Sequence, residues 1–98
     1  MSDYVKIVAM MVAAPGRKAE LQAVMEEFVK ATRQEPGCLE FTLHESLDHD
    51  QALIMTELWA DQASLDAHIA GAAVDKVKQA DMANLVVGNQ LHRLRALT

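Results

Sequence analysis

Hydrophobic and polar residues follow two different periods along the 98-residue chain. Apolar runs or period-two alternation predict strands over residues 4–14, 38–46, 52–59 and 89–97. Apolar residues spaced three and four positions apart predict a helix over residues 17–34. Turns are predicted at Pro15-Gly16, Pro36-Gly37 and Gly88. A second helical region lies between residues 61 and 83.

The second helical region is interrupted. Asp61 is a good N-cap, and Gly71 breaks the helix that follows, so we expect a further helical segment over residues 74–83. The stripe of the first segment consists of Leu65, His68, Ile69 and Ala72. The element order predicts an α+β, ferredoxin-like βαββαβ fold, with helices on one face of a four-stranded antiparallel sheet.

The first strand is apolar on both faces, although helices in this fold cover only one face of the sheet. Alternation places one set of side chains on each face: Val5, Ile7, Ala9 and Met11 against Tyr4, Val8, Met10 and Val12. We expect a second copy of the chain to cover the open face as a homodimer. The alternative is that the C-terminal segment folds over this face within one chain.

Composition narrows the class of protein. Apolar residues make up 51% and charged residues 23%, which indicates one globular domain over residues 1–98. A net charge of −5 argues against a nucleic-acid partner. A single cysteine, Cys38, gives no intrachain disulfide, and the chain shows neither a signal peptide nor a membrane-spanning run. We expect a cytoplasmic protein without a membrane partner.

Glu57 and His68 are the candidate chemical groups. The sequence lacks GxGxxG, P-loop, GxSxG and CxxC motifs, and its histidines show no metal-binding spacing, so we expect no metal. Glu57 interrupts an apolar strand, and His68 lies on the apolar stripe of the next helix. If the two faces meet, an acid and an imidazole share an apolar cavity and can move a proton.

Each of these residues also has a purely structural interpretation. Glu57 and His68 can form a buried, mutually satisfied pair, Trp59 can belong to the core, and Met55 can serve only packing. His44 lies on the polar side of its strand and either reaches the pocket or faces solvent. Arg93 and Arg95 share one strand face, where they form dimer salt bridges or, alternatively, an anion site.

Three segments resemble one family. Residues 35–38 read E-P-G-C, residues 57–59 read E-L-W, and residues 63–68 read A-S-L-D-A-H. In this order and spacing they resemble the antibiotic biosynthesis monooxygenase family, which comprises small dimeric α+β barrel proteins. The resemblance implies a homodimer joined through the open sheet face, no cofactor, and a cavity between sheet and helices that takes a small aromatic or other apolar substrate.

The resemblance implies a monooxygenase that oxidises a small quinol or polyphenol with molecular oxygen. His68 would deprotonate or orient the hydroxyl, and Glu57 would set the tautomer of the imidazole. The residues expected to bind substrate are Trp59, His44, Met55 and Leu65. A non-catalytic binding or stress-associated protein and a small-molecule isomerase remain as alternatives. Haem-degrading members of the family have an asparagine on their first strand. Residues 7–12 contain none, so the resemblance disfavours haem degradation.

Overall fold

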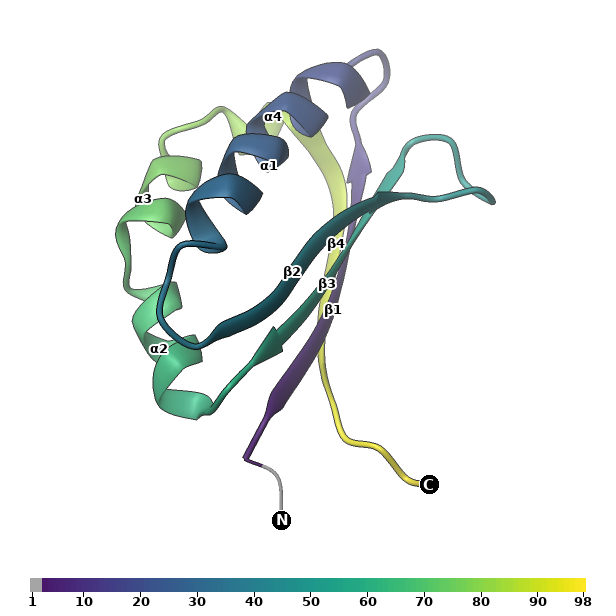
Figure 1. Cartoon of the computed structure of the whole chain (residues 1–98). Helices are drawn as coiled ribbons and strands as arrows, with labels where there is room; N and C mark the ends of the chain where they lie inside the picture. The colour runs from purple at the N-terminus through teal and green to yellow at the C-terminus, as the bar shows by residue number, and fades with distance from the viewer. Residues whose placement is uncertain (1–2) are drawn as a thin grey trace.

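The computed structural model describes residues 3–98 and forms a curved sheet with all helices on one side (Figure 1). The expectation that the chain lacks a signal peptide rests partly on Met1 and Ser2, which lie outside the described residues. The elements are β1 (Val5–Ala13), α1 (Lys18–Thr32), β2 (Cys38–Glu45), β3 (Ala52–Trp59), α2 (Gln62–Ile69), α3 (Ala72–Lys78), α4 (Met82–Leu85) and β4 (Val86–Leu94).

The sheet has the order β2-β3-β1-β4, and every neighbouring pair is antiparallel. This topology confirms the predicted α+β, ferredoxin-like fold. No helix in residues 3–98 is long and apolar enough to cross a membrane.

The core lies between α1 and the covered face of the sheet. Leu21, Met25 and Val29 recur along α1 at spacings of four and are 0 to 6% exposed. They pack with Phe41 of β2 and with buried side chains of β1 and β3. Each large apolar side chain buried in this way contributes about 1.5–3 kcal/mol, so the stripe on α1 holds the helix against the sheet.

The register of β1 separates its two faces. Ile7 lies opposite Glu57, and Met11 lies opposite Leu53, and all four side chains are buried beneath the helices. Val8, Met10 and Val12 of β1 alternate with these residues and point to the other side of the sheet. We call that side the open face, and its apolar residues are Val8, Met10, Val12, Ile54, Leu58 and Leu94.

Three expectations about the C-terminal half are wrong. β4 begins at Val86 rather than residue 89, and Gly88 lies inside the strand opposite Val12 instead of forming a turn. A register shift between Val12 and Ala13 accompanies this pairing. The helical region also divides into three short helices, of which α3 starts after Gly71 and α4 after Asp81.

Candidate functional site

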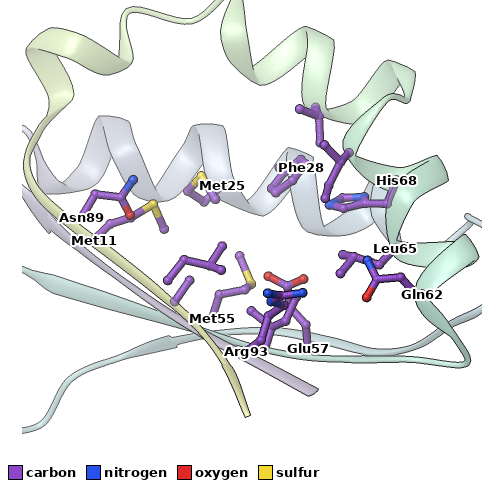
Figure 2. Close-up of a pocket in the computed structure, with 15 residues that line it drawn as sticks. Met11, Met25, Phe28, Met55, Glu57, Gln62, Leu65, His68, Asn89 and Arg93 are labelled. Atoms are coloured by element: carbon purple, nitrogen blue, oxygen red, sulfur yellow. The ribbon is translucent and has the colours of Figure 1, made fainter. Parts of the chain in front are cut away.

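A cavity of about 470 Å³ lies between the helices and the covered face of the sheet (Figure 2). Its walls come from β1, β3 and β4 below and from α1, α2 and α3 above. The volume falls within the range of small-molecule sites, and most of the lining side chains are apolar. Both Glu57 and His68 line this cavity, so the structure brings the two candidate groups to one site.

His68 is held rigidly on the helix side of the cavity. Asp61 caps α2 by accepting a 2.8 Å hydrogen bond from the Ser64 N–H, which fixes the start of the helix. The imidazole is 6% exposed and stacks on Trp59 with 4.6 Å between ring centroids. The ring centroids of Phe28 and Phe41 each lie 5.6 Å from the centroid of the His68 ring. The ring therefore has little freedom to rotate.

Glu35 orients the imidazole. Its Oε1 lies 2.6 Å from Nδ1 of His68, and the two side chains are 22% and 6% exposed. A carboxylate only accepts, so Nδ1–H donates in this bond and leaves Nε2 as the basic nitrogen. Within residues 3–98, Nε2 of His68 forms no hydrogen bond. It is also not one of the unpaired polar atoms that are completely shielded from solvent. Nε2 is thus available to a ligand.

The turn before β2 places Glu35 beside α2. The Ala60 N–H donates a 2.8 Å bond to the Gly37 carbonyl, which ties this turn to the end of β3. Gly37 has a φ of 81°, and a Cβ on it would overlap the Ser64 hydroxyl. Only glycine suits both the backbone conformation and this close approach. The turn and the first residues of α2 are thereby locked together.

Glu57 lies on the sheet side of the cavity and is 7% exposed. Trp59 donates a 3.0 Å hydrogen bond from Nε1 to its Oε1. Burial raises the pKa of Glu57, and this effect outweighs the Trp59 bond and the charge of His68, which lower it. The expectation that Glu57 sets the His68 tautomer is wrong, because Nδ1 bonds Glu35 instead.

The other predicted site residues divide into two groups. Met55 and Leu65 line the cavity, where their part in binding substrate stays a prediction. Trp59 is fully buried behind His68 and is not part of the cavity wall. His44 pairs with Ile54 on the open face and lies 3.0 Å from the Thr56 hydroxyl, so the structure does not bring it to the cavity.

One side of the cavity is formed by β4, an edge strand. Asn89, Leu91 and Arg93 line it from there, and all three are exposed. The cavity therefore opens along β4. Arg93 lies on the covered side of the sheet, opposite Ile7, rather than on the open face where a dimer salt bridge would need it. Asn89 and Gln62 are further polar lining residues that the sequence did not single out as substrate-binding.

Most of this chain matches the model of a known protein family. The family model described as antibiotic biosynthesis monooxygenase matches residues 4–80, from the start of the first strand through the helices around the cavity. The chain belongs to the antibiotic biosynthesis monooxygenase family. The resemblance seen in the sequence is thus confirmed, and the matched part of the chain contains Glu35, Glu57 and His68.

Several solved structures share the fold of this chain. PA3566 from Pseudomonas aeruginosa is 26% identical with a TM-score of 0.91, covering 100% of this chain and 98% of that one. Rv0793 from Mycobacterium tuberculosis is 24% identical with a TM-score of 0.87, covering 97% and 96%. SnoaB from Streptomyces nogalater, a cofactor-independent oxygenase, is 21% identical with a TM-score of 0.84, covering 99% and 96%.

Two curated relatives match over shorter segments. The Synechocystis protein sll1783 is 33% identical over 54 residues, which are 55% of this chain and 37% of the relative. In the sequence match to Rv0793, identity is 29% over 68 residues, which are 69% of this chain and 66% of the relative. The matched segments therefore span about a third and about two thirds of the length of these relatives.

Proposed function

We propose that the chain is a cofactor-independent monooxygenase that oxidises a small quinol or polyphenol with molecular oxygen. The observation that carries the proposal is the Glu35–His68 pair, whose imidazole lines an otherwise mostly apolar cavity with Nε2 available. Family membership and the fold shared with SnoaB, itself a cofactor-independent oxygenase, support it.

His68 would act as the base. A phenolic hydroxyl has a pKa near 10 in water, so it stays protonated at neutral pH unless a neighbouring group accepts its proton. Nε2 can accept that proton while Nδ1–H remains bonded to the Glu35 carboxylate, which stabilises the imidazolium that forms. Glu35 is thus a positioning residue, and it acts on the substrate through His68.

The deprotonated substrate then supplies the electrons. A quinolate passes an electron to oxygen, and recombination of the resulting pair forms a carbon–oxygen bond. For a simple hydroquinone the balance is one quinol plus one O₂ giving one hydroxyquinone plus one water. The substrate provides all four electrons, one oxygen atom enters the product, and the other leaves as water. The apolar walls formed by residues such as Met55 and Leu65 keep bulk water from the intermediates.

Oxygen uptake with a panel of quinols tests this function. His68→Ala should lower kcat at least roughly a hundredfold, because general-base catalysis contributes 10²–10⁴. His49→Ala is a suitable control, since His49 lies in the exposed loop between β2 and β3, away from the cavity. An oxygen-consuming activity that survives His68→Ala refutes the assigned role. Ligand binding without oxygen uptake would instead favour a non-catalytic or isomerising protein.

We also propose that the chain forms a homodimer through the open face. Val8, Met10, Ile54 and Leu58 lie side by side there and stay only half-buried in a single chain. Covering them with a second open face removes apolar area from water, worth about 25 cal/mol per Å². Sedimentation should give a dimer for the wild type and a monomer for Met10→Lys. A monomeric wild type at micromolar concentration contradicts this interface.

A further inference from the structure

Arg93 is the one Lys or Arg side chain that lines the cavity in residues 3–98. It reaches from β4 into the space on the helix side of the sheet (Figure 2). In the described part of the chain it forms no ion pair within 4.0 Å, either with Glu57 or with any other acidic residue. Its guanidinium is therefore not neutralised by a carboxylate of the described residues, and it remains available to an anionic group bound in the cavity.

The strand register places Arg93 at the same level of the sheet as Glu57. Glu57, Ile7 and Arg93 are successive neighbours across β3, β1 and β4. Adjacent strands are about 4.8 Å apart, so the Cα atoms of Glu57 and Arg93 are separated by about 10 Å. Asn89 lies four residues from Arg93, or about 13 Å further along β4. A ring bound between Glu57 and His68 therefore has Arg93 at its side.

The polarity of the cavity matches an amphipathic ligand. The buried side chains Ile7 and Met55 surround the space next to Glu57, whereas Arg93 and Leu91 lie at the exposed edge. An aromatic ring would fill the apolar part, and an acidic substituent would face the opening. A guanidinium binds a carboxylate with two parallel N–H···O bonds, which are stronger than bonds between neutral groups.

We propose that Arg93 selects substrates that carry a carboxylate on the hydroxylated ring. This inference rests on the proposed function because it places the substrate in the same cavity, with its hydroxyl at His68. The charge on the substrate would also favour entry along β4, where Arg93 is the exposed cation at the opening. The substrate class is then narrowed from quinols in general to acidic ones.

Binding without oxygen tests the inference separately from turnover. Calorimetric titration under argon compares hydroquinone with 2,5-dihydroxybenzoate, which differs by one carboxylate. For the wild type we expect the carboxylate to bind roughly tenfold more tightly, since one exposed charge-assisted contact is worth about 1.5 kcal/mol. Arg93→Gln should reduce this preference to near unity. Arg95→Gln, which removes the same charge just beyond the end of β4, should keep it.

The outcomes distinguish the inference from the proposed function. A wild type that binds both ligands equally, or an Arg93→Gln variant that retains the preference, overturns the role of Arg93 alone. Oxygen uptake with neutral quinols would then still support the monooxygenase. Failure of the wild type to bind either ligand counts against both proposals. An Arg95→Gln variant that also loses the preference shows a general charge effect and refutes the specific contact.

Discussion

Replacing Glu35 by glutamine isolates the effect of one charge on the proposed base. The 2.6 Å contact with Nδ1 of His68 can persist in the variant, because the glutamine carbonyl oxygen accepts the same N–H. The side chain keeps its size, and the turn at Pro36-Gly37 keeps its hydrogen bond to Ala60. What disappears is the negative charge that stabilises the imidazolium after proton transfer.

The magnitude follows from the burial of the pair. A hydrogen bond to a charged group contributes about 1.5–3 kcal/mol, and a neutral one about 0.5–1.5 kcal/mol. With His68 6% and Glu35 22% exposed, solvent screens the pair only weakly, so the difference of about 1–1.5 kcal/mol applies nearly in full. If the barrier for proton transfer rises by this difference, kcat falls roughly five- to tenfold. KM should hardly change, because Glu35 does not line the cavity.

Steady-state oxygen uptake gives kcat and KM for Glu35→Gln, and a thermal melt shows whether the fold is intact. Glu45→Gln is the matched control, since Glu45 is exposed at the end of β2 and distant from His68. A folded Glu35→Gln variant with wild-type kcat would refute the proposal that Glu35 prepares His68 for catalysis. A rise in KM with unchanged kcat would assign Glu35 to substrate binding instead.

Two further variants test the electrostatics and the backbone of the site. The pKa of Glu57 is raised by burial, so its stabilising contribution is full below about pH 4.3 and is lost as the pH rises through the folded-state pKa. Glu57→Gln should therefore gain stability relative to wild type between pH 4 and pH 7 in denaturant melts; a constant difference contradicts the burial argument. Gly37→Ala should cost about 1–3 kcal/mol, because the residue has a positive φ and its Cβ would overlap Ser64. Urea unfolding measures this loss, Gly16→Ala is the control with a positive φ but open space, and equal losses in both variants would show that the clash is unimportant.

Local patterns were sufficient to predict most of the fold. β3 has the predicted bounds, and buried and half-buried residues alternate along it from Leu53 to Trp59. The turn predicted at Gly88 is wrong, because a glycine within a strand and a glycine in a turn look alike in sequence. Gly88 is part of the strand because it pairs with Val12, next to the register shift between Val12 and Ala13. This pairing joins residues far apart in the chain, so local sequence does not reveal it.

The candidate site was predictable only in part. Glu57 and His68 follow one another closely in the chain, so their meeting could be inferred from a strand and the next helix. Glu35 lies 33 positions before His68, in a turn without periodicity, and the sequence marks it only as the first residue of the E-P-G-C motif. The pairing of Cys38 with Trp59 brings that turn to α2. A register for β2 and β3 would have been the signal that revealed the contact.

The exposed edge formed by β4 has a consequence for how substrate range can change. His68 is enclosed by Trp59, Phe28 and Phe41, so a substitution there disturbs packing and costs stability. Asn89 and Arg93 border the same cavity but are solvent-exposed, and substitutions at such positions are usually within about 0.5 kcal/mol of neutral. Substitutions along β4 can therefore change ligand preference while His68, the proposed base, and its aromatic neighbours stay intact.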